Sequence, residues 1–158
     1  MTTRVKYVSL YQANDALARF GAMELPPAVA LALAPVMRAV TVALNDVDPI
    51  RLRLVEECAL RDDDGQKVAG PPGPAGPTTA IDPEKLGDFN QQISELLGAE
   101  VDLPQLMATV FMHPRMPNFR PELLGLLGDI LVDDVNQPDA VSNGARPHPE
   151  RVGVTAPR

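Results

Sequence analysis

The stretch that decides the fold runs from Leu25 to Arg61 and reads LPPAVALALAPVMRAVTVALNDVDPIRLRLVEECALR. Its apolar residues recur every three or four positions, which places them on one side of an α-helix. These residues are Val29, Leu33, Val36, Val40, Leu44 and Val47. At about 1.5 Å per residue, an unbroken helix of this length would span on the order of 50 Å. The stretch therefore predicts the scaffold for the rest of the chain.

Two prolines interrupt this apolar pattern. Proline has no backbone N–H, and its ring clashes with the preceding helical turn. Asp46 and Asp48 are good N-cap residues just before Pro49, so the pattern predicts one helix to about Val47 and a second helix from Pro49. Pro35 predicts a bend nearer the start. We therefore expect a long kinked helix.

The composition of the 158 residues limits the size and chemistry of the fold. This length suits one domain with a modest core. The core must be aliphatic because the chain has four Phe, two Tyr and no Trp. The formal net charge of −7 argues against direct nucleic-acid binding, since phosphate neutralisation needs clustered Lys and Arg. Cys58 is the single cysteine and is predicted to be a small buried apolar side chain.

Membrane contact is not expected. The chain shows no amino-terminal apolar signal segment and no run of roughly 18 apolar residues. The sequence therefore predicts a protein made in a cytoplasm, with no contact to a membrane.

Two elements are predicted before the scaffold. Residues Thr2 to Val8 alternate between apolar and polar side chains, which is the period of a half-buried edge strand. Ser9 and Gln12 form a capping-box pattern, so we expect a helix from Leu10 to Phe20 that Gly21 ends in a left-handed conformation. The apolar face of this helix consists of Leu10, Ala13, Leu17 and Phe20.

A turn and a linker should follow the scaffold. The run Asp62 to Gly65 lacks the alternating oxygen ligands and the later Glu of a helix-loop-helix calcium site, so it predicts a solvated turn that reverses the chain. The run Gly70 to Pro77 has a Gly-X-Y repeat that is too short for a stable collagen-like triple helix. We predict an extended polyproline-type segment there, within a flexible Gly/Pro linker over residues 66–80.

The second arm of a helical hairpin is predicted next. Asp82 suits the N-cap, Pro83 the first helical position and Gly98 the position after the end. The apolar stripe of this helix should lie against the scaffold helix. The stripe consists of Leu86, Phe89, Ile93, Leu96 and Leu97.

Strands and a last helix should complete the domain. The segment from Glu100 to Met112 predicts one or two strands, with Val101 and Leu103 facing inward, that pair with the amino-terminal strand. Pro121 then opens a helix from Glu122 to about Asp133. Its apolar residues, which should cover the core, are Leu123, Leu124, Leu127, Ile130 and Leu131.

Together these elements predict a mainly α fold with a minor β component. A helical hairpin is built on a long kinked helix and accompanied by a small sheet of two or three strands. Residues 1–135 should form this single domain. Residues 136–158 carry four prolines and no aromatic residue, so a disordered tail is predicted there.

We predict no catalytic, cofactor-binding or metal-binding residues and expect a non-enzymatic protein. His113 and His148 both precede a proline, and neither has a Cys, Asp or Glu nearby at ligand spacing. No nucleophile elbow, Walker loop or dinucleotide fingerprint occurs. One enzymatic alternative stays open, namely two carboxylates that only the fold brings together, such as Glu56 or Glu57 with Glu95.

Two segments are candidates for partner binding. A proline-punctuated loop carries Met and Phe side chains that suit an adaptable contact surface, with half-buried packing of the loop as the alternative. The tail is mildly basic and could meet acidic groups, with a solvated terminus as the alternative. The candidate residues are Phe111, Met112, Met116, Phe119, Arg146, Arg151 and Arg158.

Five stretches of the chain carry a likeness to a known group of proteins. They are LYQANDAL at Leu10 to Leu17, ELPP at Glu24 to Pro27, DDG at Asp63 to Gly65, FNQQISELL at Phe89 to Leu97 and EVDL at Glu100 to Leu103. These stretches resemble small uncharacterised proteins encoded among tailed-bacteriophage genes. The resemblance covers about residues 8–133. Such relatives have an uninterrupted long helix, so Pro49 and the proline-rich linker depart from the pattern.

This resemblance implies a structural protein associated with the virion at the head, neck or tail. Its partners would be other phage structural proteins, and a homo-oligomer is a further option. The alternative is a transient assembly chaperone or host-directed inhibitor that is not part of the particle. The expected location is accordingly the virion, or the host cytoplasm during assembly.

Overall fold

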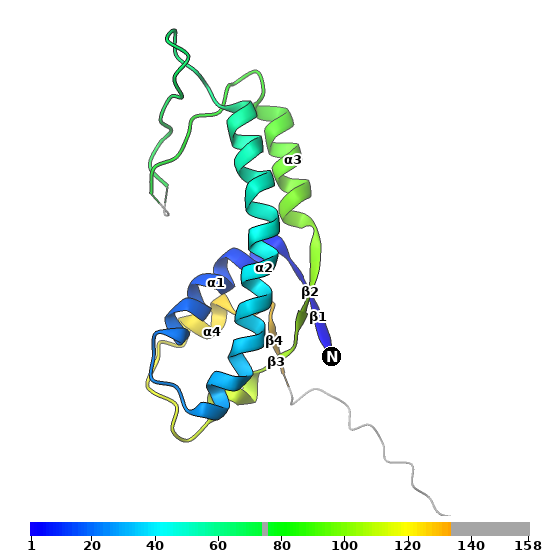
Figure 1. The fold of residues 1–158 in the computed structure, drawn as a ribbon, viewed down its shortest axis with the longest axis vertical. Coiled ribbons are helices and arrows are strands. Elements are labelled where there is room, and N and C mark those ends of the chain that lie inside the picture. Colours follow the sequence, from blue (N-terminus) through cyan, green and yellow to red (C-terminus); the bar gives the residue numbers. More distant parts are fainter. Residues whose placement is uncertain (74–75, 134–158) are drawn as a thin grey trace, which may run out of the picture.

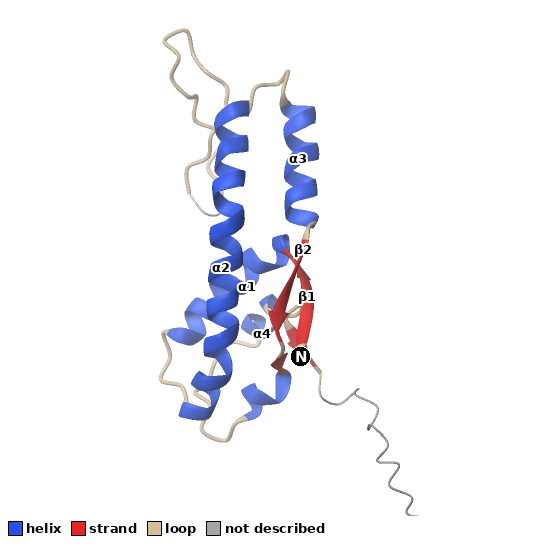
Figure 2. Ribbon diagram, turned by 45° about the vertical axis from the view of Figure 1, so that its right-hand side comes forward, coloured by secondary structure: helices blue, strands red, loops and turns tan. Residues whose placement is uncertain are grey.

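The computed structural model describes residues 1–73 and 76–133, which pack along one long central helix (Figure 1). The elements in chain order are β1 (Thr2–Lys6), α1 (Tyr7–Gly21), α2 (Pro27–Cys58), α3 (Leu86–Gly98), β2 (Glu100–Pro104), β3 (Leu106–Met107), a 3₁₀ helix (Ala108–Met112), α4 (Glu122–Leu126) and β4 (Leu131–Val132). The prediction of a mainly α fold with a minor β component is confirmed (Figure 2).

α2 runs as one helix through both of its internal prolines, so the prediction of two helices separated at Pro49 is wrong. Pro35 and Pro49 are both exposed and lie about four turns apart, hence on the same side of the helix. The carbonyl oxygens that lose an N–H partner, those of Leu31 and Asn45, therefore belong to the solvent side. Water can bind these oxygens, so no unsatisfied polar group is buried.

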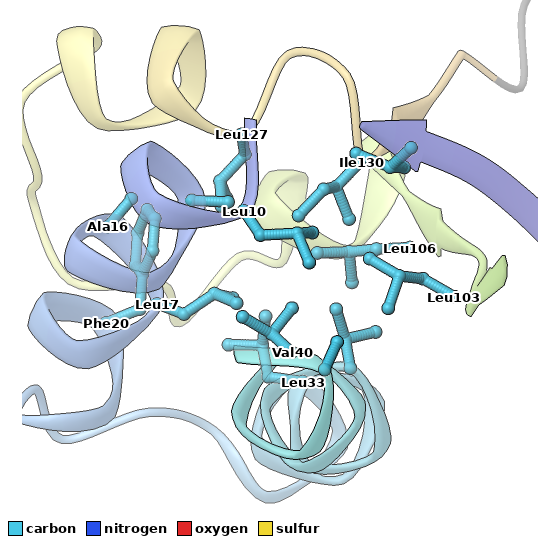
Figure 3. Packing of buried hydrophobic residues seen from close by; sticks show 14 of the residues in the cluster. Leu10, Ala16, Leu17, Phe20, Leu33, Val40, Leu103, Leu106, Leu127 and Ile130 are labelled. Carbon is cyan, nitrogen blue, oxygen red and sulfur yellow. The ribbon is translucent and has the colours of Figure 1, made fainter. Parts of the chain in front are cut away.

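The inner face of α2 forms one wall of the hydrophobic core, as its periodicity predicts. All six residues of that pattern are buried: Val29, Leu33, Val36, Val40, Leu44 and Val47. Cys58 at the end of the helix is free and buried, which confirms its assignment as a small apolar side chain. Figure 3 shows the core side chains of α2 pointing toward those of α1 and of the β segments.

α1 begins earlier than predicted, and the capping box at Ser9 is wrong. β1 ends at Lys6 and the helix starts at Tyr7, so Ser9 lies inside the helix, where its hydroxyl contacts the Asp129 carboxylate. The backbone N–H of Tyr7 donates to the carbonyl oxygen of Ala99 at 3.0 Å. A backbone group distant in sequence thus satisfies a donor of the first turn.

The apolar face of α1 is confirmed, but its end differs from the prediction. Leu10, Ala13, Leu17 and Phe20 are all buried. Ala22 caps the helix in a right-handed conformation (φ −84°), and its N–H donates to the carbonyl oxygen of Ala18 at 3.1 Å. Among the described glycines, positive φ values occur at Gly65 and Gly76, so the predicted left-handed stop at Gly21 is wrong.

The β component consists of two separate pairs of strands. β1 and β2 are antiparallel, with Val5 opposite Val101 and both Val5 and Leu103 buried, which confirms the predicted pairing. β3 pairs in parallel with β4, so that Leu106 lies opposite Leu131. The chain after β3 turns into the 3₁₀ helix instead of continuing as a strand.

α2 and α3 lie side by side and form the predicted helical hairpin (Figure 2). α3 begins at Leu86, a few residues after the predicted Asp82 cap. Asp82 instead caps the turn before the helix: its Oδ1 accepts from the N–H of Glu84 at 2.9 Å, and its carbonyl oxygen accepts from the N–H of Lys85 at 3.0 Å.

The reversal of the chain after α2 is confirmed. Gly65 has a φ of 77°, a left-handed conformation that glycine adopts without steric cost. The Asp62 carboxylate oxygen Oδ1 accepts from the N–H groups of Asp64 at 3.1 Å and Gln66 at 2.8 Å. The backbones of Arg61 and Lys67 form an isolated antiparallel β-bridge across the turn.

The proline-rich segment folds back on itself, so the extended polyproline-type prediction is wrong. The N–H of Gly70 donates to the carbonyl oxygen of Thr78 at 2.8 Å. Leu60, Val68 and Ala80 also form a closed cycle of backbone hydrogen bonds. The N–H of Val68 donates to the carbonyl oxygen of Leu60, that of Ala80 to Val68 and that of Leu60 to Ala80, at 2.8–2.9 Å. The donors of these bonds precede or follow the prolines, so the missing N–H groups of the prolines do not prevent the pairing. The flexibility of residues 66–80 stays a prediction.

The last helix is shorter than predicted. α4 spans Glu122–Leu126, and the following turn leads into β4 instead of extending the helix to Asp133. Gly125 and Gly128 weaken helical conformation over this stretch. The turn allows Leu131 to pair with β3 while Ile130 is fully buried.

Candidate interaction surfaces

The loop predicted to bind a partner is largely part of the core. Phe111 is buried, and its ring centroid lies 4.9 Å from that of Phe20 and 6.2 Å from that of Phe119. The ring centroid of Phe119 also lies 5.2 Å from that of Phe20, in an edge-to-face arrangement. These three rings hold the loop against the end of α1. Phe111 is therefore not available to a partner, which corrects its assignment as a contact residue.

The other predicted contact residues have different positions. Met116 and Phe119 are half-buried and pack against the core, whereas Met112 is 74% exposed. Met112 is thus the one residue of the four loop candidates that is mainly exposed. The predicted tail contacts Arg146, Arg151 and Arg158 lie outside the described residues, as does the predicted tail itself.

An open groove of about 520 Å³ lies between the end of α1 and the segment that leads into α4, including the start of α4. Its apolar lining comes from Met23, Phe119 and Leu123. Two guanidinium groups, those of Arg19 and Arg120, also line it, and Arg19 pairs with Asp15 at 3.0 Å. The chemistry of the groove suits an apolar side chain next to a carboxylate.

The upper part of the hairpin, formed by the end of α2 and the beginning of α3, is an arm that extends beyond α1 and α4, although α3 also contacts α1 (Figure 1). None of the residues of α3, all of which the structure describes, is fully buried. Leu86 is 44% exposed, and Ile50 on α2 is 45% exposed. Two helices that pack only on each other leave part of each apolar surface exposed. Some apolar side chains of this arm are therefore accessible to another protein surface.

A polar cluster ties α1 to the middle of α2. The Tyr11 hydroxyl donates to Asp48 Oδ1 at 2.5 Å, and Arg51 lies over the Tyr11 ring while its Nε is 3.4 Å from Asp48. Burial raises the pKa of the Tyr11 phenol above its ordinary value, and the hydrogen bond to Asp48 adds to that effect. The cluster stabilises the contact between the helices and keeps the phenol protonated.

The carboxylates of the enzymatic alternative are held by separate partners. Lys67 and Arg61 bind Glu56 and lower its pKa, opposite to the raised pKa of a general acid. Glu57 pairs with Arg53, and Glu95 accepts a hydrogen bond from Gln91. Among residues 1–73 and 76–133, no group of three or more His, Cys, Asp or Glu side chains could hold a metal ion.

α2 is long and apolar enough to cross a membrane by length and composition alone. The expectation that the chain contains no such run is therefore wrong on those two criteria. The buried inner face of α2 shows that it serves here as the core helix of the fold, and core helices meet the same criteria. The absence of membrane contact stays a prediction.

Comparisons of the chain with protein-family models, curated proteins and solved structures return no match.

Inspection of the sequence for contact residues missed the outer face of α2. Leu31 and Val42 are 74% and 60% exposed, although they lie within the apolar scaffold stretch. The sequence does indicate this outer position, because neither residue belongs to the three-and-four spacing that defines the inner face. An apolar residue on the outer side of a helix neither fills the core nor adds solubility, which makes it a candidate for contact with another surface.

Proposed function

We propose that this chain is a non-enzymatic structural protein of a tailed bacteriophage, associated with the virion at its head, neck or tail. It acts through contacts with other phage structural proteins. The resemblance of residues 8–133 to small phage-encoded proteins supports the phage assignment. The arm of α3 and the end of α2 carries the contact part of the proposal, because its apolar residues are incompletely covered.

The chemistry of the arm defines the partner. Asp88 and Glu95 are exposed on α3, which carries no Lys or Arg between Leu86 and Gly98. A partner surface that buries Leu86 and neighbouring apolar side chains would gain from Lys or Arg at its rim. An assembly partner with an apolar groove and a basic rim fits this arm.

Mass spectrometry of purified particles of the encoding phage tests the virion assignment. Presence in a fixed ratio to known particle proteins is the expected result. Presence in the infected cell but absence from the particle would refute the assignment and favour a transient assembly chaperone or host-directed inhibitor.

Variants of the arm test how the protein is incorporated. Ile50→Asp places a charge in the arm, and Val8→Asp makes the same change at a residue of equal exposure (45%) on α1. In a phage lacking its own copy of the gene, Ile50→Asp should prevent incorporation and Val8→Asp should not, while both variants keep the circular dichroism of the wild type. Normal incorporation of the Ile50→Asp protein would exclude the arm as the contact.

A further inference from the structure

A stripe of exposed residues runs along the side of α2 that faces away from the core. With 100° per residue, nine positions of α2 fall within about 40° of Val42 around the helix axis. They are Ala28, Leu31, Pro35, Arg38, Val42, Asp46, Pro49, Arg53 and Glu56, all of which are exposed. The labelled α2 core residues, Leu33 and Val40, point away from this side (Figure 3). We call this set the outer stripe.

The centre of the outer stripe holds two opposite charges without an ionic partner. Arg38 and Asp46 form no ion pair with any residue in 1–73 or 76–133. The Nε of Arg38 donates to the carbonyl oxygen of Ala34 in its own helix, at 3.4 Å. The axial distance between Arg38 and Asp46 is about 12 Å, too far for them to pair within one helix.

These charges are arranged symmetrically about Val42. Arg38 lies four positions before it and Asp46 four positions after it, and Pro35 and Pro49 are likewise equidistant from it. Two copies of such a helix placed antiparallel on a two-fold axis present each residue to its mirror position in the other copy. Val42 then meets Val42, while each Arg38 meets Asp46 of the second copy.

We propose that the outer stripe of α2 is the interface of a homodimer in which two copies of α2 cross antiparallel at Val42. Each Arg38–Asp46 pair lies about 6 Å along the helix from the axis, and Arg38, Val42 and Asp46 form an i, i+4 row. The rows of the two copies align at a crossing angle of about −50°, the commonest class of helix packing, which brings both pairs together. Antiparallel packing also places opposite ends of the helix dipoles side by side.

The surface beside the stripe has room for the second copy. A groove of about 320 Å³ is lined by small or apolar residues and by three charged ones. They are Ala39, Val42, Ala43, Tyr7 and Val101, with Arg38, Asp46 and Asp102. Small side chains at two of these positions allow close approach of another helix. Shape and charge at the stripe thus favour the same occupant.

Charge decides between a second copy and a lipid surface. A lipid surface would have to bury Arg38 and Asp46 next to Val42 without neutralising them, whereas the antiparallel dimer pairs them. The stripe lies on a different side of the molecule from the α2–α3 seam, so this inference does not depend on the proposed function.

Charge reversal tests the dimer. Light scattering and sedimentation equilibrium of the wild-type chain should show a dimer that dissociates as salt is raised, since the ion pairs lie at an exposed interface. Arg38→Asp and Asp46→Arg should each weaken the dimer roughly tenfold or more, because each change places two like-charged pairs at the interface. A wild-type chain that is monomeric up to millimolar concentration would overturn the proposal.

Mixing the two variants is the decisive experiment. The Arg38→Asp protein carries only negative charges at these two positions and the Asp46→Arg protein only positive ones, so an equimolar mixture should form a heterodimer of wild-type strength. Arg115→Asp, a reversal at an exposed loop residue, is the control and should leave the wild-type dimer unchanged. Failure of the mixture to associate, or equal weakening by Arg115→Asp, would refute the antiparallel pairing.

Discussion

Truncation of one leucine on each side of α2 would test the orientation of this helix in the fold. Leu33 is 1% exposed and belongs to the core cluster, whereas Leu31, two residues earlier on the same helix, is 74% exposed. Leu33→Ala removes apolar groups worth about 2 kcal/mol in transfer free energy, and the remaining cavity raises the cost to about 2–5 kcal/mol. Leu31→Ala should change the free energy of unfolding by less than about 0.5 kcal/mol, because Leu31 buries little and Ala favours the helix.

Urea unfolding followed by far-UV circular dichroism measures both changes. It should be done at a protein concentration where light scattering shows a monomer, so that self-association does not contribute. The slope of the free energy with urea should be unchanged, and the melting temperature of the Leu33→Ala protein should fall by roughly 5–15 °C. Equal losses from the two substitutions, or a larger loss from Leu31→Ala, would show that α2 is rotated relative to the core.

Three further outcomes follow from local geometry. Gly65→Ala should lower the free energy of unfolding by about 1 kcal/mol because φ is 77° there. Gly87→Ala in α3 should raise it by up to about 1 kcal/mol, because Ala favours the helix and the added Cβ meets no atom. Thermal unfolding that gave the opposite signs would contradict this reasoning. Tyr11→Phe should cost about 1 kcal/mol through loss of the hydrogen bond to Asp48, and an unchanged denaturation midpoint would argue against that bond. Glu56 has a lowered pKa in the folded state, so it stabilises the fold at pH values above its ordinary pKa of 4.5. This stabilisation is lost as the pH falls through the lowered pKa. The melting temperatures of the Glu56→Gln protein and the wild type should therefore differ at pH 7 and converge in acid.

The candidate interaction surfaces were predicted less well than the helices. The Met and Phe residues after β3 suggested an exposed loop, yet Phe111 and Phe119 pack on Phe20, which is distant in sequence. Side-chain type shows that a residue can make an adaptable contact, but burial depends on which surface lies opposite. The outer stripe was missed for a related reason, since only the assembled core shows which side of α2 is left uncovered.

The sequence by itself determined the features that depend on a few neighbouring residues. Spacing of three and four identified the buried face of α2 and that of α1, and the Asp-Gly turn at Gly65 followed from local backbone preference. Pro27 at the first position of α2 is likewise a local effect, because the first turn of a helix needs no N–H there. Such signals act within one or two helical turns and therefore persist whatever the rest of the chain does.

The tertiary structure alone decided features whose partners are distant in the chain. Pro49 does not end α2, because its side of the helix faces water and the rest of the helix is held by packing on α1 and α3. Tyr7 starts α1 because Ala99 accepts its N–H, and β4 replaces the end of the predicted last helix because Leu106 provides a strand partner for Leu131. In each case the free energy of long-range contacts exceeds a local preference, which ranges from about 1 kcal/mol per residue to about 3 kcal/mol for a proline inside a helix, and sequence patterns alone do not show that excess.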